Sequence, residues 1–329
     1  MRLHYAIRYL AIIAALLILP HLMTDQYSQH ILNMVLIYCI LAISVNLVFG
    51  YMGALTFGHI AVFAIGAYTS SLLATKLGLS FLPSFFFAGV SGAIVGIVIG
   101  IPTLKLAGAY FAMATIGFHK IMEVIFENWE TVTGGPTGVT GIPYPIIFGI
   151  HFKSEENYYY LIAAVALGIY ALYRNLIRSH RGKIIIAMRD NAIAASAMGI
   201  DVPSVRIIVF TISTIFAALA GSLYAHMVRY VAPEAFPLSD SLMLLFMVVL
   251  GGPGFLNGPI WGAVLIVLAN EYLQQFERFN MLIFGIAIMA LLIFLPSGFA
   301  GLIERFKFQL SRKKVGDAYV REVGLEEIK

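Results

Sequence analysis

The chain has 329 residues, of which 60% are hydrophobic and 12% are charged, and its net charge is +4 at neutral pH. Soluble domains have roughly 45–50% apolar and about 25% charged residues, so this chain cannot cover itself with polar surface and needs lipid as its solvent. A soluble domain is therefore excluded. Nucleic-acid binding is excluded with it, since that needs a basic face on a soluble domain. The single cysteine, Cys39, rules out a disulfide within the chain.

Ten apolar segments predict the transmembrane helices, each of which needs about 20 residues. In chain order they are Tyr5–Met23, Ile31–Phe49, Leu55–Thr75, Pro83–Ile101, Leu106–Phe126, Tyr158–Tyr173, Val205–Val228, Ser241–Gly251, Pro259–Leu273 and Met281–Leu295. The third is rich in glycine and polar residues, and the eighth is short. We therefore expect an all-α polytopic membrane protein with about ten transmembrane helices (roughly 8–10), some of them broken or short.

Positive charge predicts the orientation, because cytoplasmic loops carry an excess of Lys and Arg. With the N-terminus inside, every Lys and Arg is cytoplasmic except Lys76, Lys153, Arg229 and Arg278, which are outside, and Lys120, which lies within a span. The opposite orientation would violate the rule. Both termini are thus expected in the cytoplasm.

The same orientation divides the chain. Residues 1–303 form a transmembrane domain, and residues 304–329 form a cytoplasmic C-terminal tail. Within the domain we expect a cytoplasmic segment at 174–204 and an outer loop at 128–157.

Two segments rich in glycine and proline interrupt the helical pattern. TVTGGPTGVTGIP contains Gly134 and Gly135, and GGPGFLNGP begins with Gly251 and Gly252. In transporters built from repeats, two such segments in the two halves mark broken helices around a site near the membrane midplane. We expect broken helices at these glycines, and whether the two halves form an internal repeat stays open.

Small residues recur at helical spacing in two spans. Ala88, Gly92, Gly96 and Gly100 line one helix face, and a second set lines another: Ala217, Gly221 and Ala225. Such faces let helix backbones approach closely in lipid. Packing within the chain is favoured over a dimer interface.

Catalytic and cofactor motifs are missing from the sequence. The glycine-rich strings lack the Lys and Ser/Thr of a phosphate-binding loop, the histidines show no metal-ligand spacing, and no catalytic triad or pair of carboxylates is visible. We expect no catalytic residue, no metal and no cofactor on this chain, which is predicted not to be an enzyme.

Ionisable residues within the spans, and at the outer end of one of them, are the candidates for a transport path. Lys120, Glu123 and Glu127 share one helix face, and His59 lies in a glycine-rich span. Such residues usually face a cavity or one another. The alternatives are an ion pair near the outer boundary for the three charged residues, and a hydrogen-bonded structural role for His59.

The cytoplasmic segment contains a short helix, in RGKIIIAMRDNAIAASAMGIDVP. Asp190 or Asn191 is the predicted N-cap and Gly199 the left-handed residue that ends the helix. Asp201 then caps the next helix, which has Pro203 in its first turn. A helix this short is marginal alone in water, so it is held either by its own bundle or by the groove of a partner.

Five motifs resemble one family of membrane proteins. In order they are GYMGALTFGHIAVFAIGAYT, LKLAGAYFAMATIGF, ENWETVTGGPTGVTGIP, AMRDNAIAASAMGIDV and VVLGGPGFLNGPIWGA. Together they look like the membrane permease subunit of the branched-chain amino-acid ABC importers, the LivM-like branch. The resemblance spans roughly Asn46 to Gly301 and is specific to the family, but related permeases handle urea and short amides.

The resemblance implies a fold related to the ten-helix ABC importer permeases, in the inner membrane of a bacterium or archaeon. It implies a homologous second permease, two ATPase subunits that bind ATP and Mg, and an extracytoplasmic solute-binding protein. Leucine, isoleucine or valine would cross by alternating access. An ion-coupled secondary transporter is a less favoured alternative.

The resemblance also assigns the short cytoplasmic helix as the helix that couples to the ATPase. The residues expected there are Asp190, Ile193, Ala194, Ala195, Ala197 and Gly199. Ala194, Ala195 and Gly199 match the importer pattern EAAxxxG, whereas its first position is Ile193, and Ala192 stands where relatives commonly have an acidic residue. A salt bridge from that acidic residue to the ATPase is therefore not expected in this chain.

Overall fold

The computed structural model describes residues 19–21, 25–103, 106, 108–147 and 149–274, together with single residues at 285, 298 and 301. Most of the predicted spans Tyr5–Met23 and Met281–Leu295 lies outside the described residues. So do the tail 304–329, Lys105 and Arg278.

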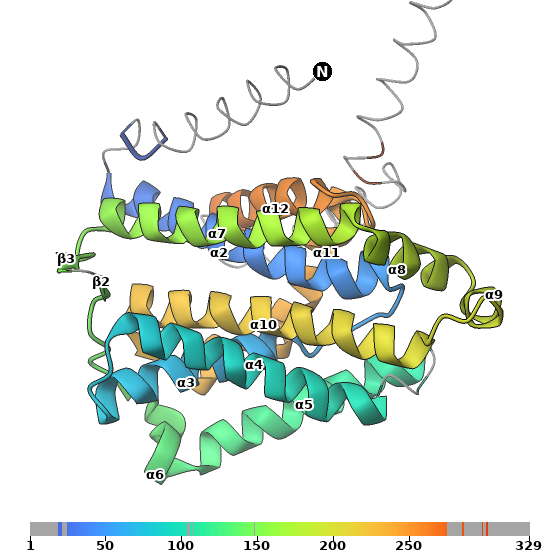
Figure 1. Cartoon of the computed structure of the whole chain (residues 1–329). Coiled ribbons are helices and arrows are strands. Elements are labelled where there is room, and N and C mark those ends of the chain that lie inside the picture. The colour runs from blue at the N-terminus through green and yellow to red at the C-terminus, as the bar shows by residue number, and fades with distance from the viewer. Residues whose placement is uncertain are drawn as a thin grey trace, which may run out of the picture.

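Helices dominate the described chain (Figure 1). They are α2 (Gln26–Asn46), η1 (Leu47–Tyr51), α3 (His59–Lys76), α4 (Phe81–Thr103), α5 (Ala109–Asn128), α6 (Glu130–Thr133), η2 (Gly135–Thr137), α7 (Glu155–Arg178), α8 (His180–Asp190), α9 (Ala192–Ala197), α10 (Val202–Val228), η3 (Pro233–Ala235), α11 (Leu238–Gly251) and α12 (Gly258–Gln274). Two short antiparallel pairs join β1 (Val139–Thr140) to β4 (Tyr230–Val231) and β2 (Ile146–Ile147) to β3 (Ile150–His151).

Six helical segments of the described chain are long and apolar enough to cross a membrane. They are Gln26–Tyr51, Phe81–Thr103, Ala109–Asn128, Glu155–Arg178, Val202–Val228 and Pro233–Gly251. The expected multi-span helical architecture is thus confirmed, and each of the six overlaps a predicted span. Helices α3 and α12 match the predicted spans Leu55–Thr75 and Pro259–Leu273, but α3 is too polar and α12 too short to count among the six.

Helix α10 packs on α3 and α4 through glycine contacts. A Cβ atom added at Gly66 of α3 would lie 2.1 Å from the Ala218 carbonyl oxygen, and one at Gly92 of α4 would lie 2.7 Å from the Ala218 Cβ. A Cβ at Gly221 would lie 1.9 Å from the Phe63 carbonyl oxygen. The small-residue faces are therefore used within the chain, as predicted, because only glycine allows these backbones to touch.

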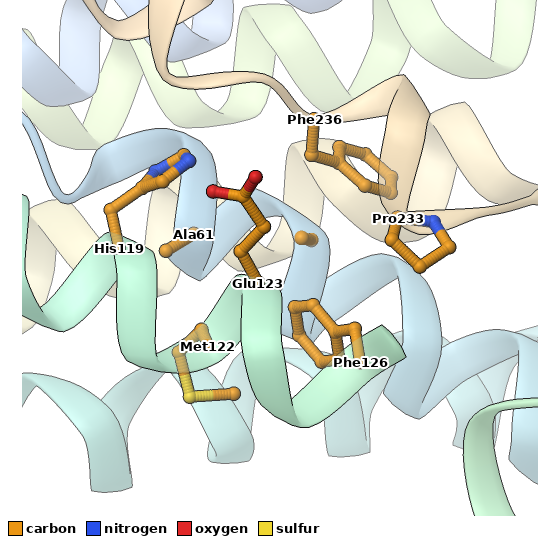
Figure 2. A pocket seen from close by; sticks show the side chains of 8 residues that line it. Ala61, His119, Met122, Glu123, Phe126, Pro233 and Phe236 are labelled. Atoms are coloured by element: carbon orange, nitrogen blue, oxygen red, sulfur yellow. The ribbon is translucent and has the colours of Figure 1, made fainter. Parts of the chain in front are cut away.

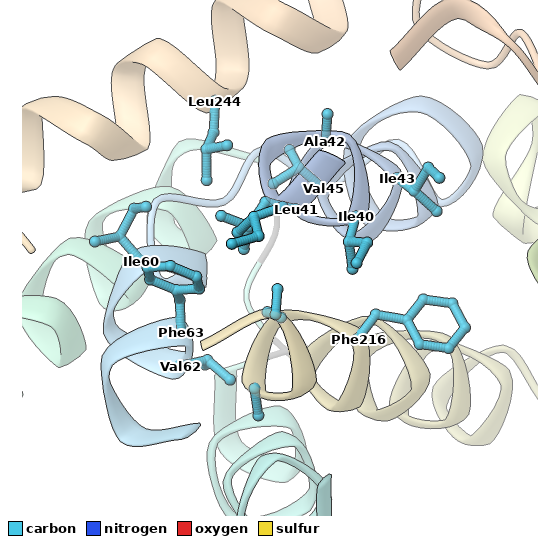
Figure 3. Packing of buried hydrophobic residues seen from close by; sticks show 14 of the residues in the cluster. Ile40, Leu41, Ala42, Ile43, Val45, Ile60, Val62, Phe63, Phe216 and Leu244 are labelled. Carbon is cyan, nitrogen blue, oxygen red and sulfur yellow. The ribbon is translucent and has the colours of Figure 1, made fainter. Parts of the chain in front are cut away.

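The apolar core is centred on α2. Ile40, Leu41 and Val45 are buried there and face Phe63 of α3, Phe216 of α10 and the neighbouring α11 (Figure 3). Lipid supplies little hydrophobic drive between helices, so this interdigitation stabilises the bundle mainly through dispersion contacts.

The chain leaves the α-helical path between α2 and α3. A π-helical turn, η1, ends α2, and an extended stretch then leads to His59, so the predicted span at Leu55 starts too early. Side chains hold this extended backbone: Phe57 N–H donates to Thr115 Oγ1 (3.1 Å), and Ser241 Oγ donates to the Phe57 carbonyl (2.7 Å). Extended backbone is stable at membrane depth only where protein groups satisfy it in this way.

The two ends of the bundle carry different structures. Helices α8 and α9 extend from one end, whereas α6, β2 and β3 lie at the opposite end (Figure 1). Segments 174–204 and 128–157, predicted on opposite sides of the membrane, are therefore at opposite ends of the molecule.

Candidate coupling helix and transport path

Asn191 and Gly199 delimit α9. The Asn191 side chain accepts a hydrogen bond from Ala194 N–H (2.9 Å), and Gly199 is left-handed with φ of 84°. Asp190 is not the cap; it is the last residue of α8 and pairs with Arg189 at 2.9 Å. Asp201 caps α10 by accepting from Ser204 N–H (3.4 Å). Local capping geometry thus sets this corner of the chain.

The two faces of α9 differ in exposure. Ile193 is 85% exposed and Met198 is 84% exposed, while Ala194 and Ala197 are also on the surface. Ala195 is only 5% exposed and packs into the core of its own chain, so it is not available to a partner groove. The exposed face of α9 is therefore the one with Ile193 and Met198, and bulk at Ala195 would disturb the seat of α9 on its own bundle.

Sequence reasoning missed helix α8, which precedes α9. Ser179 caps it by accepting from Gly182 N–H (3.3 Å), and a Cβ at Gly182 would lie 2.0 Å from the Ile177 carbonyl oxygen. Ser179, three residues before Gly182, was the available sequence signal for a helix start at this corner. Between the end of α7 and the start of α10, the segment 174–204 thus contains two helices, with α9 at the tip.

The charged face of α5 carries an ion pair and lines a pocket. Lys120 Nζ lies 2.6 Å from Glu123 Oε2, and the two side chains are 54% and 29% exposed. Glu127 is exposed one turn further on, near the end of α5. The predicted ion pair is therefore present, although it does not account for the whole face.

The pocket lies between α5, α3 and η3 (Figure 2). Its lining residues are Ala61, Ala64, His119, Met122, Glu123, Phe126, Pro233 and Phe236. The Glu123 carboxylate and the His119 ring lie side by side at its rim in Figure 2. His119 is buried, and its Nδ1 atom has no hydrogen-bond partner in the described part of the chain. A carboxylate and an unpaired imidazole nitrogen thus lie beside the apolar side chains of Phe126 and Phe236 in this small pocket.

His59 does not reach this pocket. Its Nε2 atom lies 2.6 Å from Ser213 Oγ, and its Nδ1 atom lies 3.3 Å from Thr56 Oγ1. The side chain is buried with both ring nitrogens paired, so His59 fixes the start of α3 to α10. This geometry agrees with the structural alternative for His59 and not with a path residue.

The two glycine-rich segments are not brought together. Gly134 and Gly135 (φ of 81° and 60°) follow α6 at one end of the bundle. Gly251 ends α11, Gly252 has φ of 108°, and the adjoining Gly254 lies against Arg189 of α8 at the other end. Both segments interrupt helices, but they do so at opposite ends and not around one midplane site.

Comparison with known proteins gives consistent results. The family model described as branched-chain amino acid transport system / permease component matches residues 28–294. The high-affinity branched-chain amino acid permease LivM of Salmonella typhimurium is 34% identical, over 84% of this chain and 70% of the relative. LivH of the same organism is 24% identical, over 80% of this chain and 91% of the relative. The autoinducer 2 permease LsrC of Enterobacter sp. is 24% identical, over 67% of this chain and 65% of the relative. No solved structure matches the chain.

The helical bundle and the six long apolar segments of its described part define a multi-pass membrane protein. The chain belongs to the branched-chain amino acid transport system permease family, and it is of the LivM type. As a permease component it is not an enzyme and binds no cofactor of its own; ATP is bound by partner ATPase subunits.

Proposed function

We propose that this chain carries leucine, isoleucine or valine across the inner membrane of a bacterium or archaeon, as one permease of an ATP-driven importer. Its similarity to LivM supports the substrate class. The match to LsrC shows that the wider family also includes an importer of a different small solute. Urea and short amides, named by the sequence resemblance, are the competing substrates.

A second, homologous permease completes the membrane part of the proposed assembly. The observation that carries this proposal is the surface of α5. Helix α5 is the least hydropathic of the six candidate spans; its most apolar stretch is 28% buried, close to the 22% of α7, so its charged residues and not its exposure set it apart. Lys120, Glu123 and Glu127 are costly in lipid, and charged residues in spans normally face a cavity or another protein.

The solute path is therefore proposed to run along α5, between this chain and a LivH-like partner. LivH is itself similar to this chain over most of its length, which supports a pair of related permeases. On the path, the pocket with His119 and Glu123 offers polar contacts beside the apolar surface of Phe126 and Phe236. Such a lining suits an amino acid with an ammonium group and a branched apolar side chain.

Coupling to one of the two ATPase subunits is proposed at α9. Its tip position and its exposed Ile193 and Met198 support a helix seated in a groove of the ATPase. ATP binding would close the ATPases, move α9, and open the bundle to the opposite side. The binding protein would deliver the solute at the α6 end, with both chain termini cytoplasmic.

Reconstitution tests this function and its substrate. We expect proteoliposomes with both permeases, both ATPases and the binding protein to take up labelled leucine only with internal ATP. Unlabelled isoleucine and valine should compete, whereas urea and acetamide should not. Uptake that needs an ion gradient and no ATPase would favour a secondary transporter instead. Competition by urea or amides would indicate that these are the substrates.

A further inference from the structure

One buried amide joins three parts of the bundle at the end of α2. Asn46 Nδ2 donates to Tyr173 Oη of α7 (2.8 Å) and to the Phe255 carbonyl (3.1 Å), and Asn46 Oδ1 accepts from Gly254 N–H (3.1 Å). Asn46 is fully buried. The end of α2 is therefore fixed to α7 and to the loop between α11 and α12.

The π-helical turn η1 brings Gly50 against this amide. A Cβ atom at Gly50 would lie 2.0 Å from Asn46 Oδ1 and 2.4 Å from Gly254 N. In a continued α-helix the Ala54 N–H would bond to the Gly50 carbonyl, but here it bonds to the Val48 carbonyl (3.1 Å). The Gly50 carbonyl, like others at a helix end, is left for another donor.

Arg189 supplies that donor from α8. Its Nη1 atom donates to the Gly50 carbonyl oxygen at 2.9 Å. The Arg189 side chain lies across two glycines. A Cβ atom added at Gly53 would lie 2.9 Å from Arg189 Cγ, and one added at Gly254 would lie 2.8 Å from Arg189 Nη1. Gly53 and Gly254 have φ of 76° and 78°, a backbone region that disfavours side chains. We call Gly50, Gly53 and Gly254 the glycine notch.

Asp190 orients the guanidinium in the notch. Its Oδ1 atom accepts from Arg189 Nε (3.1 Å) and from Arg189 Nη2 (2.9 Å). Arginine offers several donors in a fixed plane, so these bonds set the direction of the third one, to Gly50. A lysine would keep a charge near the carbonyl but could not form the same set of contacts.

The notch lies between the coupling helix and the helix with the solute pocket. Arg189 and Asp190 come directly before Asn191, the cap of α9. On the other side, the extended stretch after Gly53 leads to Phe57, which bonds to Thr115 of α5 and to Ser241 of α11. A break such as η1 and an extended stretch are the kind of element that absorbs backbone rotation, and π-helical turns are frequent at functional sites.

We propose that Arg189 is a positioning residue that transmits the movement of α9 to the broken end of α2, and through the extended stretch to α5 and α11. The inference rests on the proposed function, since it assumes that ATPases drive α9. Neither the helix caps nor the exposed face of α9 provides this link between α9 and α2. Without this contact, α9 would move while the bundle stays closed.

The test compares variants in the reconstituted importer. Arg189→Ala is matched with Arg181→Ala, which removes the same charge from the exposed first turn of α8, and with Arg189→Lys. Leucine taken up per ATP hydrolysed is measured at equal amounts of assembled complex. For Arg189→Ala we expect a fall of roughly tenfold or more, the size expected for loss of a charge-assisted hydrogen bond. Arg189→Lys should fall between this variant and the wild type, and Arg181→Ala should match the wild type.

The outcomes separate the inference from the function it rests on. Wild-type uptake per ATP in Arg189→Ala would overturn the inference and leave the proposed function standing. Loss of assembled complex in both Arg189 variants, with a normal transport ratio in what remains, would overturn it as well, because Arg189 would then serve folding alone. A wild-type complex without ATP-dependent uptake would overturn the proposed function itself.

Discussion

Glu123 is part of an ion pair and also lies on the proposed transport path. It pairs with Lys120 and also lines the pocket beside His119. An exposed ion pair contributes only about 0.2–1 kcal/mol to stability, and this pair is partly exposed. A charge that contributes so little to folding is better explained by the pocket that it lines.

Glu123→Gln is expected to reduce uptake by roughly tenfold, the equivalent of about 1.4 kcal/mol in solute binding or passage. The amide keeps the shape of the side chain but removes its charge from the pocket. Uptake is measured per assembled complex, with Glu130→Gln on the exposed helix α6 as the control that loses the same charge elsewhere. An equal loss of assembled protein would instead make Glu123 a structural partner of Lys120.

Local residue roles were predictable from the sequence, and distant ones were not. Gly199 and Asp201 were assigned correctly because a helix cap depends on neighbours along the chain. One partner of His59 is Ser213, far away in the sequence, and the carbonyl bound by Arg189 belongs to Gly50. Such pairs depend on how the helices pack, which no local pattern contains.

At the scale of the elements, glycine decides which helices touch. The contact of Gly66 with the Ala218 backbone brings α3 onto α10, whereas a Cβ at Gly168 of α7 would meet nothing within 4 Å. Both glycines lie within helices. Replacing each of them with alanine therefore separates the effect of an added methyl group on packing from its effect on helix propensity.

Gly66→Ala should destabilise the purified chain by about 1–3 kcal/mol, since the added methyl group overpacks the contact. Gly168→Ala should be neutral or stabilising by roughly 0.5–1 kcal/mol, because alanine favours the helix. Thermal unfolding of both variants in the same detergent measures the difference. Equal unfolding temperatures would mean that α3 and α10 are not in backbone contact.

Helix positions were predictable from apolar runs, but breaks in the helices were less so. Each of the six long apolar segments overlaps a predicted span, because about 20 apolar residues leave little alternative in lipid. The extended stretch before His59 was missed, since its backbone is held by Thr115 and Ser241 from other helices. Helix α8 was missed because it is short and polar and lies outside the spans.

For the whole molecule, the arrangement of its two ends links structure to transport. Helix α9 lies at one end, and β3 lies at the other (Figure 1). The family could be inferred from motifs spread along the chain, but the sequence alone did not show that the glycine segments lie at opposite ends. Their separation places the loop at 252–257 at the α8 end of the molecule, where Gly254 lies against Arg189.

In the proposed importer, the α9 end engages the ATPase. A photoreactive residue placed at Ile193 on α9, and in a separate variant at Ile150 on β3, tests it in the assembled importer, since both positions are exposed. We predict that position 193 cross-links to the ATPase subunit and that position 150 does not. Capture of the ATPase from position 150, or its absence from position 193, would contradict the account.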